Sequence, residues 1–126
     1  MKKYKYTLLL VIGLLSMGAF PSCKNKNASV AKIFIRSASN LLMPGARVVI
    51  IADIQENEYE GEFVDTLITN SEGYVEFDIS DYYTSAGKKI EIGNFDIIVT
   101  KENKTGNGYV RTRVHSTTVE TVFLQE

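Results

Sequence analysis

After the first 29 residues, apolar residues occur in short runs whose side chains alternate with polar ones, and turn-forming residues separate the runs. Ile33 and Ile35, for example, fall on one face of an extended chain, with Lys32, Phe34 and Arg36 on the other. This period of two, with many β-branched side chains and no long segment of helical periodicity, predicts an all-β chain. We expect seven strands, at 31–36, 46–52, 62–69, 74–79, 95–100, 109–114 and 117–124.

One connection carries a clear turn signal. Asn70-Ser71-Glu72-Gly73 is typical of a type I turn, because Asn in the first position can bond to the backbone and Gly is favoured in the fourth. The turn predicts that the flanking runs 62–69 and 74–79 form a hairpin.

The other runs and connections are less distinctive. The run 46–52 is almost continuously apolar, which is typical of a central strand or of one buried on both faces. Residues 80–87 are expected to form a loop or a single helical turn, with Ser80 as its cap. Residues 102–108 are expected to form a loop.

The amino-terminal residues follow a different pattern. Three lysines precede a nearly uncharged, Leu-rich run at 7–20, which is shorter than the about 20 residues of a membrane-spanning helix. A core helix is the alternative, but a small domain could not bury such a helix all round. The pattern therefore predicts the apolar region of a secretory signal.

The only cysteine follows this run directly, in Ala19-Phe20-Pro21-Ser22-Cys23. A small residue before a single Cys resembles a bacterial lipoprotein cleavage site, of the looser kind seen in Bacteroidetes. The resemblance implies a signal peptide at 1–22, a lipid on Cys23 and a polar tether at 23–29. The alternative is an ordinary signal peptide that leaves a free thiol, which would be a liability in an oxidising compartment.

The resemblance also implies an address in the cell envelope, with the lipid in the outer membrane. No acidic residue follows Cys23 directly, which favours the periplasmic side, although surface exposure stays open. Residues 30–126 then form one modest β-sandwich domain.

Composition narrows the function classes. Removal of residues 1–22 leaves 11 basic and 15 acidic side chains, a net charge of −4 that argues against nucleic-acid binding. A single Cys excludes an internal disulfide, and a single His excludes a site with two histidine ligands. We expect no cofactor and no resident metal.

Four segments in order resemble the transthyretin-like, carboxypeptidase-regulatory-like domains. They are Pro44-Gly45-Ala46-Arg47-Val48-Val49-Ile50, the run 69–77 in which Asn70 replaces a common Asp, the run 93–99 and the closing run 119–124. The resemblance covers nearly all of 30–124 and implies a seven-stranded Greek-key β-sandwich of the transthyretin-like or immunoglobulin-like kind. Such folds host many roles, so the resemblance alone assigns none.

Catalysis has little support in the sequence, and we expect no enzyme. The hydroxyisourate hydrolase branch of the resembled family needs several histidines and a carboxy-terminal Tyr-Arg-Gly-Ser, and this chain has neither. His115 is expected at the turn before the last strand in a structural role, because neighbouring Ser116 would point to the opposite face. The run Glu56-Glu58-Glu60-Glu62 is expected to solvate an exposed end, since it lacks the spacing of a calcium loop.

Binding is therefore the expected activity. Our first hypothesis is a non-catalytic binding or accessory module in a cell-envelope complex, with a sheet edge that accepts a partner strand. The alternative is a small glycan-binding lipoprotein of a polysaccharide-uptake system, because four tyrosines lie in or beside predicted loops. These candidate ligand-binding residues are Tyr59, Tyr82, Tyr83 and Tyr109. Asp65-Thr66-Leu67 also resembles an O-glycosylation motif of Bacteroidetes, and an ordinary strand tripeptide is the equal alternative.

Overall fold

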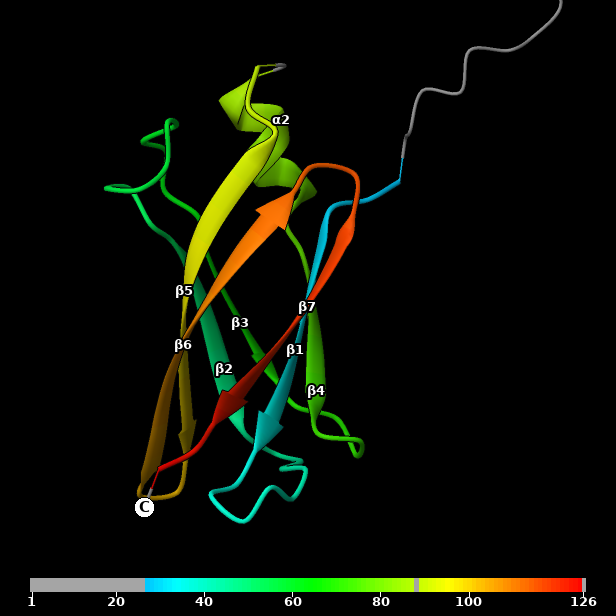
Figure 1. Ribbon diagram of the computed structural model, residues 1–126, viewed down its shortest axis with the longest axis vertical. Helices are drawn as coiled ribbons and strands as arrows, with labels where there is room; N and C mark the ends of the chain where they lie inside the picture. Colours follow the sequence, from blue (N-terminus) through cyan, green and yellow to red (C-terminus); the bar gives the residue numbers. More distant parts are fainter. Residues whose placement is uncertain (1–26, 88, 126) are drawn as a thin grey trace, which may run out of the picture.

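A computed structural model describes residues 27–87 and 89–125 of the chain. These residues form seven strands and one short helix (Figure 1). The elements are β1 (Val30–Arg36), β2 (Arg47–Ala52), β3 (Val64–Ile68), β4 (Tyr74–Asp78), α2 (Ser80–Ala86), β5 (Ile92–Lys101), β6 (Lys104–Arg113) and β7 (Thr117–Phe123). In this part of the chain, no helix is long and apolar enough to span a membrane.

The strands form two sheets that pack face to face. Sheet A has the order β4-β1-β7, and sheet B has the order β3-β2-β5-β6. All neighbouring strands run antiparallel except β1 and β7, which run parallel. Only the β2–β3 and β5–β6 connections stay within one sheet, so the chain passes repeatedly from one sheet to the other, as in Greek-key sandwiches. The prediction of a seven-stranded all-β sandwich is confirmed.

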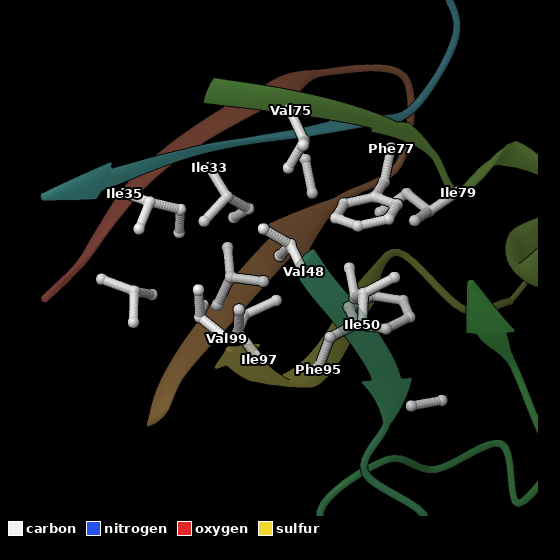
Figure 2. Packing of buried hydrophobic residues seen from close by; sticks show 14 of the residues in the cluster. Ile33, Ile35, Val48, Ile50, Val75, Phe77, Ile79, Phe95, Ile97 and Val99 are labelled. Atoms are coloured by element: carbon white, nitrogen blue, oxygen red, sulfur yellow. The ribbon is translucent and has the colours of Figure 1, made fainter. Parts of the chain in front are cut away.

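The core lies between the two sheets and follows the predicted alternation. Figure 2 shows Ile33 and Phe77 of sheet A facing Val48, Ile50 and Phe95 of sheet B, and all five are fully buried. Each such side chain contributes about 1.5–3 kcal/mol by leaving water, so this layer dominates the stability of the domain. The run at 46–52 was expected to be a central strand, and β2 does lie inside sheet B.

The expected hairpin is wrong, although its turn forms. The Gly73 N–H donates to the Asn70 C=O at 3.0 Å, and Gly73 has a φ of 76°. However, β3 pairs with β2 in sheet B, while β4 pairs with β1 in sheet A. Buried Thr69 explains the separation, because its N–H donates to the Ala46 C=O and its hydroxyl binds the Met43 C=O at 2.7 Å. The chain is thereby held beside β2 until the turn redirects it to the other sheet.

The expected loop at 102–108 is also wrong for most of its length, because β6 already begins at Lys104. Its glycines lie where β7 crosses closely. A Cβ on Gly106 would lie 2.5 Å from the Phe123 carbonyl oxygen, and one on Gly108 would lie 2.4 Å from a Val122 methyl carbon. Glycine therefore serves close strand packing at these positions, where the sequence suggested a loop.

Residues 80–86 form a seven-residue helix, longer than the single turn expected. The residue before it, Ile79, is the N-cap and makes no side-chain capping bond. The Ser80 hydroxyl instead accepts the Ser29 N–H at 3.0 Å, so it ties the start of the described chain to α2. The predicted capping role of Ser80 is therefore wrong.

Candidate functional site

Within the part of the chain that the structure describes, strand β3 has a free backbone edge, since β2 is its only neighbour in sheet B. At the two ends of this pairing, the Ala52 N–H donates to the Phe63 C=O and the Thr69 N–H donates to the Ala46 C=O. Backbone groups of an antiparallel strand alternate in direction, so every second residue from 63 to 69 faces β2. The backbone groups of Val64, Thr66 and Ile68 therefore point away from the sheet.

The side chains of these three residues lie on the outer face of sheet B and join an aliphatic patch. Val64 is 63% exposed and Ile68 is 59% exposed. In register beside β3 lie Val49 and Ile51 of β2, and then Ile98 of β5. We call these residues, with Thr66, the β3 patch. The solvent face of an antiparallel sheet is usually polar, and a contiguous apolar area of this kind often marks an interaction site.

The other edge strands differ from β3. Strand β4 carries Glu76 and Asp78 toward solvent, and charged side chains discourage strand pairing. Strands β6 and β7 lie close together, and one bridge joins Thr105 to Gln125. Val119 and Phe123 of β7 are exposed on the outer face of sheet A. Among the described strands, β3 is the one whose residues are all exposed, and it includes Val64, Leu67 and Ile68.

One polar side chain occupies a backbone donor of the β3 edge. The Asp65 carboxylate accepts the Thr66 N–H at 2.7 Å, so the central outward donor is occupied within the strand itself. Both residues are exposed, which means that water can replace this bond at little cost. An incoming strand could therefore displace the Asp65 carboxylate from the Thr66 N–H.

The charges around the β3 patch are unequal at its two ends. The β2–β3 connection carries the exposed carboxylates of Glu56, Glu58, Glu60 and Glu62, which solvate an exposed end as expected. At the other end, Arg47 lies in register beside Ile68. The Lys101 ammonium lies at the same end, where it binds the Pro44 carbonyl. The surface is thus acidic where β3 begins, whereas Arg47 and Lys101 supply positive charge where it ends, beside the exposed carboxylates of Glu72 and Glu102.

The structure does not bring the four candidate tyrosines together as a platform. Tyr82 and Tyr83 belong to α2 and are only 2% and 5% exposed, and burial raises the pKa of both phenols. The ring of half-buried Tyr59 lies 5.4 Å from that of Tyr82, and the Tyr83 hydroxyl bonds to Thr112 Oγ1 at 2.7 Å. The expected position in or beside loops is wrong for Tyr82 and Tyr83, because both rings complete the core.

Tyr109 alone stays exposed, at 45%, on the outer face of β6. Its hydroxyl donates to Asn94 Oδ1. Partial desolvation, followed by the nearby carboxylates of Glu56 and Asp53, raises the pKa of Tyr109. A shallow groove of about 290 Å³ begins beside it, and its lining includes Glu56, Asn94 and Arg111.

The wall of this groove is fixed by a buried amide. The Asn57 side chain donates to the Asn94 C=O at 3.0 Å and accepts the Asn94 N–H at 2.7 Å, much as a neighbouring strand would. The arrangement holds the β2–β3 connection against the start of β5. Nothing in the local sequence predicted this contact, because the two asparagines are far apart along the chain.

His115 lies at the β6–β7 turn, as expected, with a left-handed φ of 58°. Its Nδ1 lies 2.8 Å from the Asn27 carbonyl oxygen, and its N–H donates to the Ser29 hydroxyl. The Ser116 hydroxyl donates to the Arg113 C=O at 2.7 Å, so it is directed at the backbone. These bonds fix the turn to the start of β1.

Three predictions find no test in this geometry. Cys23, the expected lipid attachment site, lies outside the described residues. Within residues 27–87 and 89–125, no three His, Cys, Asp or Glu side chains are grouped so that they could hold a metal ion. Thr66 of the suggested glycosylation motif is exposed on β3.

The β3 patch is a candidate binding surface that sequence reasoning missed. A signal was present, because the run 62–69 has apolar residues in both alternating sets, Phe63 and Leu67 in one and Val64 and Ile68 in the other.

A scan of protein-family models finds none that matches the chain, and a search of curated proteins finds no significant similarity.

Proposed function

We propose that this protein is a non-catalytic binding module of the bacterial cell envelope, anchored by a lipid on Cys23, and that β3 is its binding element. The single observation that best supports the binding role of β3 is its free edge beside an exposed aliphatic patch. An extended segment that adds to such an edge gains backbone hydrogen bonds and packs its alternate side chains on the patch. The resemblance to transthyretin-like domains is part of the same proposal.

The anchor and the surface can be tested separately. For the anchor, the full-length chain is produced in a Bacteroidetes host that is fed an alkyne-tagged fatty acid. We expect label on the unsubstituted chain and none on Cys23→Ser. An equally labelled Cys23→Ser chain would overturn the lipid assignment and leave the surface proposal standing.

For the surface, a photo-crosslinking amino acid replaces Thr66 in the full-length chain within intact cells. The matched control replaces Thr117, which is also an exposed threonine of a strand, in β7 of the other sheet. We expect a discrete crosslinked product from position 66 and none from position 117. Equal products from both positions, or none from either, would overturn β3 as the binding element.

A glycan-binding function is a second candidate, because the one exposed candidate tyrosine, Tyr109, adjoins the groove that Arg111 lines. Sugars bind to exposed rings flanked by hydrogen-bonding groups. The full-length chain in detergent is applied to a glycan array, with Tyr109→Ala and Arg111→Ala as variants. Binding that both substitutions reduce would favour this function, and no binding to any glycan would remove it.

A further inference from the structure

We infer that the segment that β3 accepts is β3 of a second copy of this chain, in an antiparallel pair with Thr66 on the two-fold axis. This inference rests on the proposed function, since it names the partner of the same edge. Three features of β3 support it: the direction of its free backbone groups, the order of its side chains and the charge at its two ends.

The backbone allows one fully overlapped register. Val64, Thr66 and Ile68 direct their N–H and C=O groups outward, so they must face the corresponding groups of the second copy. With Thr66 opposite Thr66 of the second copy, Val64 lies opposite Ile68 of the second copy at both ends. Every outward group of β3 then meets a partner, and the two four-stranded sheets join into one continuous sheet.

The side chains match in this register. Val64 and Ile68 of the two copies cover each other, and the threonines at the centre can bond across the axis. Glu62 lies opposite Asn70 of the second copy, so no carboxylates stand opposite each other in the paired rows. Pairing extends the aliphatic β3 patch across the junction, where Val64 and Ile68 of the two copies partly shield each other from water.

Charge selects the antiparallel direction. The antiparallel pair brings the acidic β2–β3 connection of one copy to the end of the second copy that holds Arg47 and Lys101. A parallel pair would instead place Glu62 beside Glu62 of the second copy and double the acidic end. Like charges in adjacent positions oppose pairing, so the two-fold arrangement is the one that these residues favour.

Asp65 sets the strength of the pair. Its carboxylate must release the Thr66 N–H before that group can donate to the second copy. In the pair, Asp65 lies opposite Leu67 of the second copy and diagonal to the other Asp65, where the two negative charges repel. The pair is therefore a reversible one that Asp65 weakens.

The test uses single cysteines in the full-length chain, in membranes of the expression host under mild oxidation. In the proposed register the Thr66 Cα atoms are about 5.5 Å apart, which suits a disulfide. We expect Thr66→Cys to form a disulfide-linked dimer. Val64→Cys and Ile68→Cys should form none singly, because each would lie roughly 14 Å from its own counterpart. The two variants produced together with different tags should crosslink to each other.

The unsubstituted chain and Thr117→Cys serve as controls for links through Cys23 and for random collision. Dimer from Thr66→Cys at no more than the level of Thr117→Cys would overturn the inference, as would equal crosslinking of Val64→Cys with itself. If the photo-crosslinker at position 66 captures a different envelope protein while Thr66→Cys stays monomeric, self-pairing fails and the proposed function stands. If position 66 gives no crosslink of either kind, both fail.

A second variant removes the backbone bond without removing the fold. Thr66→Pro lacks the outward N–H but keeps every bond between β3 and β2, whereas Thr66→Val keeps the N–H and the strand shape. By sedimentation of the detergent-solubilised chain, we expect Thr66→Pro to weaken the dimer at least about tenfold, the loss of roughly one backbone bond or more, while Thr66→Val dimerises as before. Equal dimerisation of the two variants, at unchanged melting temperature, would overturn the β3 pairing.

Discussion

The two long sides of the sandwich treat their edge strands in opposite ways. On one side, β6 and β7 approach so closely that only glycine fits at positions 106 and 108, and a bridge joins Thr105 to Gln125. On the other side, β3 and β4 belong to different sheets (Figure 1). Strand β3 keeps a row of free backbone groups beside exposed aliphatic residues. The closely packed side therefore contributes to stability, and the open side is the part of the molecule to which the proposed function assigns binding.

The closely packed side should be the more sensitive to a single methyl group. Gly106→Ala places a carbon against the Phe123 carbonyl oxygen, which belongs to the backbone and cannot rotate away. We expect a loss of about 3 kcal/mol, the upper range for overpacked sites, measured by chemical unfolding. Asn107→Ala, exposed on the same strand, should change the stability by less than about 0.5 kcal/mol. Similar losses for the two variants would show that β7 does not pack closely at this point.

The next largest loss of stability is expected when the bonds that hold β3 apart from β4 are removed. Thr69→Val leaves the buried Ala46 N–H without its side-chain acceptor and the Met43 C=O without its donor. Leaving such groups unsatisfied costs about 2 kcal/mol of unfolding free energy. Thr69→Ser retains the hydroxyl and should lose clearly less. If the serine variant is as unstable as the valine variant, the methyl group of Thr69 matters more than its bonds.

Proline substitutions in β3 should lower the stability by less, and the loss should depend on the direction of the backbone N–H that each one removes. Leu67→Pro removes a donor that faces β2 and should cost about 1.5 kcal/mol in thermal unfolding. Thr66→Pro removes a donor that only the Asp65 side chain uses, so its cost should stay below about 0.5 kcal/mol. The opposite order would mean that Thr66, and so the proposed free edge, faces into the sheet.

The smallest expected effect is the pH dependence that Asp78 gives to the stability of the fold. Hydrogen bonds from Ser80 lower the pKa of Asp78 below its ordinary value of 3.8. A carboxylate with a lowered pKa stabilises the fold fully above the ordinary pKa, and this contribution is lost as the pH falls through the lowered pKa. Asp78 is exposed, so solvent screens the effect. Asp78→Asn should therefore reduce the melting temperature slightly at pH 7 and not at all near pH 2. A constant difference between the two chains across that range would exclude the carboxylate as the cause.

The comparison between the two sides also marks what the sequence could reveal. The alternation of apolar residues predicts all seven strands, because burial on one face of a strand is a local property. The 70–73 turn was found, but the sheet that each flanking strand joins depends on Thr69 and its distant partners. Gly106 and Gly108 suggested a loop, since the close passage of β7 leaves no mark on the neighbouring residues.

The candidate site was predicted less well, for a related reason. Tyr82 and Tyr83 suggested an exposed platform because residues 80–87 are expected to form a loop or a single helical turn, whereas a seven-residue helix directs both rings into the core. The β3 patch escaped notice because an apolar residue on an outer face resembles one in the core until the strand order is known. Whether an edge is free is a property of the whole topology, and no single segment encodes it.

The place where β1 begins has a consequence for a pair of these molecules. Ser29 is held at the α2 end by bonds from its N–H to Ser80, from Ile79 to its C=O and from His115 to its hydroxyl. In an antiparallel β3 pair the two α2 ends point in opposite directions, so the two chains emerge at opposite ends of the joined sheet. If both chains are held in one membrane, the strands must run along its surface. A single copy could stand upright on the proposed lipid anchor, whereas a pair would lie flat, and self-association would then change which face the protein presents to its surroundings.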